Sequence, residues 1–246
     1  MKKCEAVKIS GLTKHYGDFC ALSDLNLSVC EGEIFGLLGP NGSGKTTAIM
    51  CLLSLINYES GRIEIFGEEM GPASASLKSQ IGIVPQDVAV FQTFTVYENI
   101  DYFCGLYEKK RRVRKTLVEE AIAFAGLEKF KNFKPHQLSG GLLRRLNLAC
   151  GIAHKPRLII LDEPTVAVDP QSRNRILKGI QDLNKAGSTI LYTTHYMEEV
   201  ESICSKCVIM DGGKILREGT VSEIKGGRDV SLNEVFLDIT GRSLRD

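Results

Sequence analysis

Apolar and polar residues alternate along much of the first third of the chain. Leu25, Leu27 and Val29 fall on one face of an extended segment, and Ile63 and Ile65 share a face in a later segment. Strict alternation is typical of a strand with one buried face and one solvated face. These segments are therefore predicted to be half-buried antiparallel strands.

Three other runs are apolar almost throughout, which is typical of strands buried on both faces of a parallel sheet. They cover residues 33–38, 157–161 and 189–194. Helices are predicted over 46–55, after the first run, and over 171–185, between the other two. Strands that alternate with helices predict an α/β fold with a mainly parallel sheet, to which the alternating segments add an antiparallel β subdomain.

Turn and capping patterns divide the last part of the chain. Residues 208–217 hold an Asp-Gly-Gly turn between two short segments, which predicts a β-hairpin. Thr220 and Glu223, and then Ser231 and Glu234, have the spacing of capping boxes. The tail is therefore expected to form short helices.

Residues 96–152 show no convincing strand pattern and are predicted to be helical. The predicted organisation is a single domain over residues 1–246. Its parts are an α/β core with the antiparallel subdomain (1–95 and 153–220), an inserted helical subdomain (96–152) and a C-terminal helical tail (221–246).

Composition narrows the class of protein. The chain has 246 residues, of which 43% are hydrophobic, so it can bury a large core. Its net charge of +1 offers no global attraction for nucleic acid or an anionic membrane surface. No stretch approaches the roughly 18 apolar residues of a membrane-spanning helix, so the chain is expected to be neither secreted nor membrane-spanning.

Two local features have a plain structural interpretation. The eight cysteines are scattered, mostly in apolar runs, and are expected to be buried thiols in a reducing compartment. Cys204 and Cys207 form a lone C-x-x-C, for which packing is favoured over metal or redox chemistry. The basic run 109–115 is expected to be the solvated start of a helix.

The segment after the first apolar run matches the phosphate-binding pattern G-x-x-x-x-G-K-[ST]. The residues are Gly39, Pro40, Asn41, Gly42, Ser43, Gly44, Lys45 and Thr46, with Thr47 following. The glycines let backbone N–H groups curl around an anion at the start of a helix. Lys45 is expected to reach the outer phosphates of a nucleotide, Thr46 to bind Mg²⁺, and Thr47 to lie close to an inner phosphate.

Acidic and imidazole side chains follow the two other apolar runs. Asp162 and Glu163 come directly after one of them, and His195 comes directly after the other. The carboxyl ends of parallel strands meet at the edge where α/β sheets hold ligands. Asp162 is suited to hold Mg²⁺ through a water, and Glu163 is suited to polarise the water that attacks the γ-phosphate.

With these motifs in this order, nearly the whole chain resembles the nucleotide-binding subunit of an ABC transporter. The resemblance implies ATP and Mg²⁺ as cofactors and assigns roles to further residues. Those residues are Tyr16 (stacking on adenine), Gln86 (sensing Mg²⁺ and the membrane partner), Ser139, Gly140 and Gly141 (the signature), Asp169 (the loop that crosses the dimer), and His195 (contact with the γ-phosphate). Lys45, Glu163 and His195 are the implied catalytic groups.

The signature also has a physical interpretation. A hydroxyl and two glycines open a predicted helix at 142–152, and such a helix start can receive an anion. One ATP needs one phosphate loop, so a second anion-receptive start makes sense if it faces the ATP of another protomer, as it does in the family. A homodimer or a heterodimer with a related subunit is therefore expected. Leu142 and the segment 165–168 depart from the commoner family pattern.

The amino-acid sequence of three segments resembles that of the drug- and multidrug-export branch of bacterial ABC systems. The segments are Gly141 to Asn147, His195 to Val200 and Glu234 to Arg242. The resemblance implies an ATPase that powers a separate membrane permease for export. It also implies a cytoplasmic location, peripheral on the inner face of the cell membrane through that permease, with no nucleic-acid partner.

Other functions were weighed against transport. A soluble ABC ATPase acting on ribosomes or nucleic acid would usually carry two cassettes or long coiled coils, and neither occurs here. A regulatory nucleotide binder without chemistry is disfavoured by intact Lys45, Asp162, Glu163 and His195. A P-loop GTPase or a small-molecule kinase is disfavoured, because no Asn-Lys-x-Asp segment for reading guanine occurs and the signature would then be unexplained.

The connector 86–99 joins the predicted helical region to the core. It contains Val88, Val90, Phe91 and Phe94. Some of these side chains are expected to line a groove for the membrane partner, while the alternative buries all of them in the local core.

Overall fold

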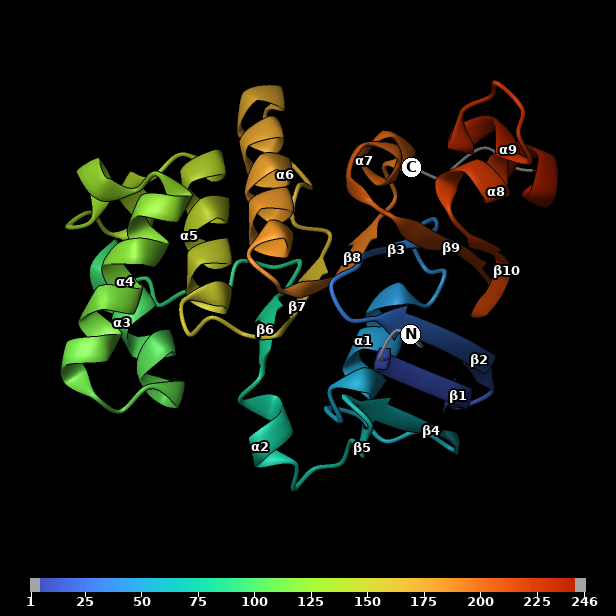
Figure 1. Ribbon diagram of the computed structural model, residues 1–246, viewed down its shortest axis with the longest axis horizontal. Helices are drawn as coiled ribbons and strands as arrows, with labels where there is room; N and C mark the ends of the chain where they lie inside the picture. Colours follow the sequence, from blue (N-terminus) through green and yellow to red (C-terminus); the bar gives the residue numbers. More distant parts are fainter. Residues whose placement is uncertain (1–4, 242–246) are drawn as a thin grey trace. The chain divides into compact units, whose positions relative to one another are not determined.

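The computed structural model describes residues 5–241 of the chain, whose course is shown in Figure 1. The chain divides into two compact units. The first contains Met1–Lys78 and Thr189–Asp246, and the second contains Ser79–Ser188. The predicted helical subdomain at 96–152 falls inside the second unit.

The first unit contains the predicted antiparallel sheet. Its strands have the order β2-β1-β4-β5. Their bounds are Glu5–Tyr16 (β1), Phe19–Cys30 (β2), Ser60–Ile65 (β4) and Glu68–Glu69 (β5). Ile9 of β1 pairs with Leu27 on one side and with Ile63 on the other, so the apolar positions of three strands line one buried face.

A second group of strands in this unit is mostly parallel. Strand β3 (Ile34–Leu38) pairs in parallel with β8 (Thr189–Thr194) and with β9 (Lys206–Asp211). Strand β10 (Lys214–Gly219) returns antiparallel to β9, which confirms the predicted hairpin. Strands β3 and β8 are buried along their whole length, as apolar runs of this kind predict.

Five helices of the first unit are described: α1 (Lys45–Leu52), α2 (Ala75–Lys78), α7 (Met197–Ile203), α8 (Val221–Lys225) and α9 (Leu232–Thr240). The prediction that α1 reaches Leu55 was wrong by three residues. Ser54 adopts a left-handed backbone conformation with φ of 54°. A helix cannot continue through that conformation, so α1 ends at Leu52.

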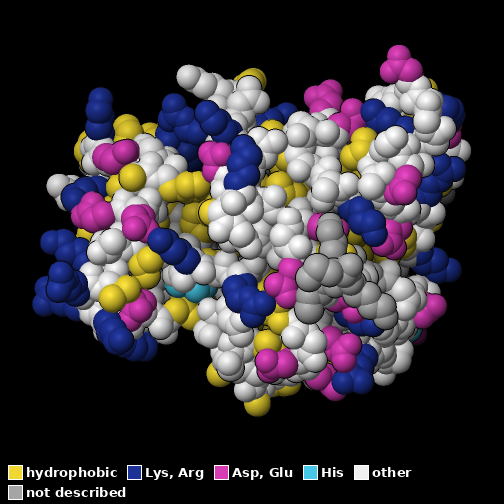
Figure 2. Space-filling view, viewed as in Figure 1, with side chains coloured by type: hydrophobic (Ala, Val, Ile, Leu, Met, Phe, Trp, Pro, Cys, Tyr) yellow, Lys and Arg dark blue, Asp and Glu magenta, His cyan; other side chains and the backbone are white. Residues whose placement is uncertain are grey.

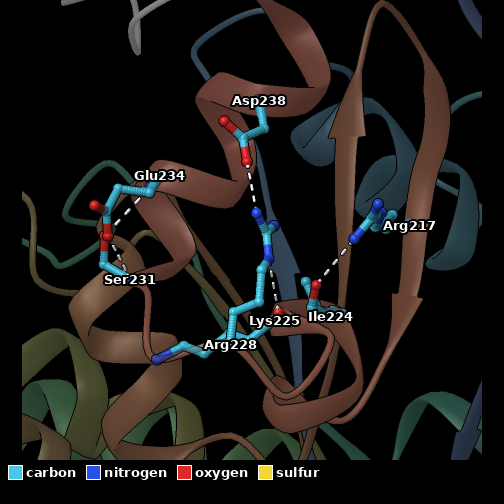
Figure 3. A network of polar contacts seen from close by, with 7 residues as sticks. All are labelled: Arg217, Ile224, Lys225, Arg228, Ser231, Glu234 and Asp238. Carbon is cyan, nitrogen blue, oxygen red and sulfur yellow. Dashed lines mark hydrogen bonds and ion pairs between the residues drawn. The ribbon is translucent and has the colours of Figure 1, made fainter.

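The tail helices begin at the two predicted capping boxes, Thr220 with Glu223 and Ser231 with Glu234. Figure 3 shows the second box, together with the ion pair between Arg228 and Asp238 at 3.1 Å. Buried apolar residues join α7, α8 and α9 to β3 and β9; they are Leu38, Met197, Val200, Cys207, Ile209, Ile224, Leu232, Val235 and Phe236. Residues 242–246 of the predicted tail lie outside the described residues.

The second unit is mainly helical. It holds α3 (Val96–Tyr107), α4 (Arg111–Ala125), α5 (Gly140–Ile152) and α6 (Pro170–Lys185), with short 3₁₀ turns η1 (Glu128–Phe130) and η2 (Pro135–Gln137). Residues 96–152 contain no strand, as predicted. Helices α3, α4 and α5 share a core that includes Ile100, Ile122 and Leu146.

Two parallel strands accompany these helices. Strand β7 (Leu158–Asp162) is the predicted apolar run, and β6 (Ile81–Val84) pairs with it. The sequence did not predict β6, because four residues are too few to show a period. Mixed parallel and antiparallel strands with helices confirm the α/β fold class.

The structure bears out the plain interpretations of composition. The basic run 109–115 is mostly exposed and α4 begins within it at Arg111. Figure 2 shows basic and acidic side chains mixed over the visible face, in keeping with the near-zero net charge. Over residues 5–241, no helix is long and apolar enough to cross a membrane.

The cysteines of the described part of the chain are free thiols, and Cys4 lies outside that part. Burial raises the pKa of Cys207 to about 12 and raises the pKa of Cys204 well above its usual value. High thiol pKa values make these side chains poor nucleophiles, which supports packing as the role of the C-x-x-C pair.

Candidate nucleotide-binding site

The phosphate loop runs from the end of β3 to the start of α1. Gly42 and Gly44 have φ values of 78° and 104°, in the left-handed region that suits glycine. A Cβ atom on Gly44 would lie 2.8 Å from the carbonyl oxygen of Ala21, whereas a Cβ on Gly42 would meet nothing within 4 Å. The loop therefore curls tightly at one glycine and leaves open space at the other.

Lys45 is folded back over its own loop. Its ammonium donates hydrogen bonds to the carbonyl oxygens of Gly39 at 2.8 Å and Pro40 at 3.1 Å, and the residue is only 4% exposed. These bonds hold the positive charge against the loop, on the helix whose N-terminus carries a partial positive charge. Thr46 and Thr47, the next two residues, are half-buried in the first turn of α1.

Ser43 supplies evidence that the loop is built for a ligand. Its hydroxyl oxygen is buried and has no hydrogen-bond partner within the described structure. A buried hydroxyl without a partner costs about 1–3 kcal/mol, so its presence calls for an explanation. Helix α1 also lacks a side-chain cap. An anion held by the loop would satisfy both groups, so the residues present fit a phosphate.

Tyr16 lies at the end of β1 and is 49% exposed. The ammonium of Lys14 lies 5.3 Å from the centre of its ring. The ring is thus accessible and has a cation beside it. Its stacking on adenine remains a prediction.

His195 follows β8 directly and is half-buried. Its ring packs on that of Tyr196, with centroids 4.1 Å apart and planes at 41°. The carbonyl oxygen of Thr194 accepts a hydrogen bond from the N–H of Gly39 at 3.4 Å. Within the first unit, the structure therefore ties the end of the strand before His195 to the first residue of the phosphate loop.

Asp162 and Glu163 lie in the second unit. Asp162 is the last residue of β7, and the two residues are 4% and 5% exposed. Glu163 has a φ of 46°, which a residue with a side chain rarely adopts. Such strain costs on the order of 1–3 kcal/mol and clusters at functional sites. The backbone geometry thus marks Glu163 as a special position.

The signature residues begin α5. Ser139 is the N-cap, and its hydroxyl accepts the N–H of Leu142 at 3.4 Å. Ser139 and Gly140 are exposed, and a Cβ on Gly140 would meet nothing within 4 Å. A Cβ on Gly141 would lie 2.9 Å from the Cβ of Ser172. Gly141 therefore allows close packing against α6, while its neighbours point outward.

Asp169 caps that neighbouring helix, α6. Its carboxylate accepts the N–H of Ser172 at 2.9 Å, and hydrogen bonds from the hydroxyl and N–H of Ser172 lower the pKa of Asp169. A Cβ on Gly141 would lie 3.1 Å from Oδ2 of Asp169. The structure thus brings the signature and the predicted dimer-crossing loop side by side within the second unit.

Gln86 is exposed in the loop after β6. The guanidinium of Arg144 donates to the carbonyl oxygen of Gln86 and, at 3.3 Å, to that of Val166 in the loop after Glu163. Burial lowers the pKa of Arg144. Arg144 therefore joins the Gln86 loop to the segment that follows Glu163.

Asn147 holds the same loop from the next turn of α5. Its amide accepts the N–H of Ala89 at 3.0 Å and donates to the carbonyl oxygen of Pro85 at 3.2 Å. Sequence reasoning assigned no role to Arg144 or Asn147. The available signal was two polar residues three positions apart inside an apolar helical run, which places them on one face.

The predicted magnesium ligands are a hydroxyl, an amide and a carboxylate, and they come from both units. Thr46 lies in the first unit, and Gln86 and Asp162 lie in the second. Among the residues that the structure describes, no group of three or more His, Cys, Asp or Glu side chains could hold a metal ion. Magnesium that is bound together with phosphates and water usually has only one or two carboxylate ligands from the protein. The predicted ligand set remains a prediction.

Comparisons with known proteins agree with these features. The sequence model of the ABC transporter family matches residues 22–166. The linearmycin resistance ATP-binding protein LnrL of Bacillus subtilis (strain 168) is 38% identical over 240 residues, covering 94% of this chain and 77% of that protein. The Nod factor export ATP-binding protein I of Rhizobium sp. (strain N33) is 38% identical over 215 residues, covering 87% of this chain and 71% of that protein.

Solved structures show the same likeness. The structure of an ATP-binding subunit of an ABC transporter superposes with a TM-score of 0.86 and 25% identity, covering 96% of this chain and 99% of that one. The cassette MJ0796, in a dimeric post-hydrolysis state bound to ADP and Pi, gives a TM-score of 0.79 and 28% identity over 87% of this chain and 98% of that one. The chain belongs to the ABC transporter family. It is an ATP-binding ATPase subunit, which confirms the predicted enzyme class.

Proposed function

We propose that this chain binds Mg²⁺ and ATP at its phosphate loop, hydrolyses ATP within a dimer of such subunits, and powers a separate membrane permease that exports a small molecule. The observation that carries the proposal is the phosphate loop. Two left-handed glycines, a buried lysine and a buried hydroxyl without a partner make a cradle there that an anion would complete.

In the proposed mechanism, the loop N–H groups and Lys45 bind the phosphates. Lys45 exchanges its bonds to the Gly39 and Pro40 carbonyls for phosphate oxygens and so places a charge-assisted hydrogen bond on the outer phosphates. Ser43 gives its hydroxyl to the same anion. Tyr16 presents its exposed ring to the adenine.

The two carboxylates take different tasks. Asp162, together with Thr46 and Gln86, would hold Mg²⁺, which neutralises phosphate charge when bound. Glu163 orients the attacking water and accepts its proton, and the strained backbone fixes its direction. His195 donates a hydrogen bond to the γ-phosphate from the end of β8.

The signature is proposed to meet the ATP of a second subunit. Ser139 and Gly140 are exposed at the start of a helix of 13 residues, where an anion is favoured. Asp169 lies next to Gly141 and would face the same second subunit. The dimeric state of the similar cassette MJ0796 supports this arrangement.

An apolar patch in the second unit is the proposed docking surface for the permease. Phe91 is 41% exposed, and its ring lies 5.0 Å from Phe94, 4.8 Å from Tyr102 and 5.9 Å from Phe103. The buried amide of Asn99 accepts the N–H of Phe91 at 2.7 Å and donates to its carbonyl oxygen at 3.0 Å. The backbone that carries the exposed ring is therefore anchored on both its N–H and its carbonyl oxygen, as suits a recognition site.

A cavity of about 200 Å³ lies beside this patch. Phe103, Leu106, Tyr107 and His154 are among its lining residues, and Leu106 and Tyr107 are 49% and 44% exposed. An apolar hollow with exposed Leu106 and Tyr107 in its lining fits a short amphipathic helix. Val88 and Val90 are only partly buried and Phe91 is exposed, so the alternative that buries all four apolar side chains of this segment in the local core was wrong. The groove for the membrane partner stays a prediction.

Export is proposed from the similar proteins named for linearmycin resistance and Nod factor export. A chain that docks on the cytoplasmic side of a permease would be peripheral on the inner face of the cell membrane. The near-zero net charge gives no reason to propose a nucleic-acid partner.

The Glu163→Gln variant tests the function directly. It should bind ATP within about threefold of wild type, while the rate of hydrolysis falls at least about a hundredfold, because the general base is gone. With ATP it should sediment as a dimer, since the uncleaved nucleotide stays between the subunits. Glu128→Gln, at an exposed carboxylate of the same unit, should behave as wild type. Wild-type hydrolysis by Glu163→Gln would refute the assignment.

A further inference from the structure

Glu199 is a buried carboxylate close to the proposed catalytic histidine. It lies in the first turn of α7 and is 3% exposed. One of its oxygens, Oε2, accepts two hydrogen bonds: from the hydroxyl of Tyr192 at 2.7 Å and from the hydroxyl of Thr194 at 2.8 Å. Burial of a carboxylate is costly unless it is bonded, so this position has been given a specific set of donors.

The hydroxyl of Thr194 links Glu199 to the residue that follows His195. The hydroxyl oxygen of Thr194 donates to Glu199 and also accepts the backbone N–H of Tyr196 at 2.9 Å. The residue before His195 is therefore bonded directly to the carboxylate of Glu199, and the residue after it is linked to that carboxylate through the hydroxyl of Thr194. His195 itself has its ring packed on Tyr196.

Helix α7, which carries Glu199, is itself braced by the C-terminal tail. The carboxylate of Glu201 accepts the N–H of Leu232 at 2.6 Å and pairs with the ammonium of Lys225 at 3.0 Å. Met197 and Val200 are buried in the core that α8 and α9 share with α7. Glu199 thus projects from a helix that is held on its other side, and its position is well determined.

We infer that Glu199 is a positioning residue for His195, holding the backbone on both sides of the histidine so that its ring points at the γ-phosphate. The inference rests on the proposed role of His195 in hydrolysis. Its physical basis is preorganisation, since a displacement of about 1 Å can cost on the order of a hundredfold in rate. Glu198, the neighbouring residue, is exposed and makes no contribution to this network in the described structure.

The test compares rate with affinity. Glu199→Leu keeps the volume but removes the acceptor, so kcat for ATP hydrolysis should fall about tenfold or more while the KM for ATP stays within about twofold. Glu199→Gln retains an acceptor oxygen and should return kcat to within about threefold of wild type. Glu198→Gln is the matched control and should leave both constants unchanged.

A second variant guards against loss of folding. Thr194→Val has nearly the same shape as threonine but lacks the hydroxyl that links Glu199 to Tyr196, so it should lower kcat as Glu199→Leu does. Thr194→Ser keeps the hydroxyl and should restore the rate. Thermal unfolding of each variant reports whether the fold survives.

A double-mutant cycle with His195→Ala separates positioning from structure. If Glu199 acts through His195, then Glu199→Leu should lower the rate less than about twofold in the His195→Ala background. An undiminished tenfold loss there, or a raised KM with unchanged kcat, would overturn the inference alone. A His195→Ala variant with the wild-type rate would overturn the proposed role of His195 and the inference with it.

Discussion

The phosphate loop and the signature each place glycines at the start of a helix, but the two helix starts are built differently. In the phosphate loop, Lys45 is 4% exposed and bonds to two carbonyl oxygens of the loop. In the signature, Ser139 and Gly140 are exposed and Gly140 has open space around it. One helix start holds a buried lysine against its own loop, and the other presents its serine and glycine outward.

This difference fits the proposal that one helix start holds the chain's own ligand and that the other is completed by a partner. The enclosed loop supplies the charge and the desolvation that strengthen hydrogen bonds to phosphate. The exposed helix start supplies N–H groups and a partial charge but nothing that excludes water. It therefore becomes effective only when another surface covers it.

The largest expected effect is on the enclosed side. Lys45→Met should weaken ATP binding by about a hundredfold or more, because one or two charge-assisted hydrogen bonds of about 1.5–3 kcal/mol each are lost. Equilibrium binding of a fluorescent ATP analogue measures the change. Lys214→Met, at an exposed lysine of the same unit, should bind as wild type does. Unchanged affinity in Lys45→Met would remove the phosphate loop as the main binding site.

A substitution in the exposed signature should change dimerisation and leave the affinity for ATP unchanged. In the Glu163→Gln background, Ser139→Arg should keep ATP binding but abolish the shift from monomer to dimer, because it places bulk and charge where the partner's phosphate must fit. Sedimentation velocity with and without ATP measures the shift. The control for Ser139→Arg is Lys178→Ala, at an exposed position of α6, which should leave dimerisation unchanged. Ser172 is not used as a control position, because it packs on Gly141 and an arginine there would disturb the fold. Persistent dimerisation of the Ser139→Arg variant would contradict the two-sided site.

The apolar patch extends the comparison to a different partner. Phe91→Asp should leave the isolated subunit folded with its basal ATPase, while stimulation by the permease and transport are lost. The physical reason is that a carboxylate cannot be buried in an apolar interface without a large penalty. Hydrolysis and transport by the reconstituted complex measure this.

Phe19→Asp is the control for Phe91→Asp, because Phe19 is 64% exposed in the antiparallel sheet of the first unit. It should leave coupling intact. Loss of folding in Phe91→Asp would instead support burial of the connector in the local core, and full transport would remove this segment from the interface.

The smallest effects concern the backbone of the two glycine loops. Gly42→Ala should destabilise the fold by about 1–2 kcal/mol, because alanine disfavours the left-handed conformation found there. Gly140→Ala should be neutral or slightly stabilising, since alanine favours the helix and nothing lies within 4 Å of its Cβ. Urea unfolding measures both. Equal destabilisation by the two substitutions would contradict the backbone difference between the loops.

Much of the fold could be predicted because its signals are local. The period of apolar residues identified β2, β3, β7 and β8, and the capping boxes marked the starts of α8 and α9. Strand β6 was not predicted, because its four residues become a strand through pairing with β7, which is far away in the sequence. The C-terminal end of α1 was not predicted either, because the residue type of Ser54 does not require its left-handed backbone conformation.

The candidate site divides in the same way. Residue types and spacing alone pointed to the phosphate loop, the two carboxylates and the histidine, because the chemistry of phosphate binding limits which residues can serve. They did not reveal Arg144, which bonds to Gln86 from 58 residues away, or Asn147, which bonds to Pro85 from 62 residues away. Nor did they reveal that Glu199, and not its neighbour Glu198, is the buried carboxylate beside His195.

The sequence by itself therefore determined the family, the α/β class and the residues that are proposed to meet the nucleotide. Each of these depends on residues close together in the chain, through backbone conformation, helix capping and hydrophobic period. Only the tertiary structure decided which helix start is enclosed, which aromatic side chains stay exposed, and which distant polar groups hold the catalytic loops. Those outcomes depend on burial and on partners brought together by folding, and neither can be read from local spacing.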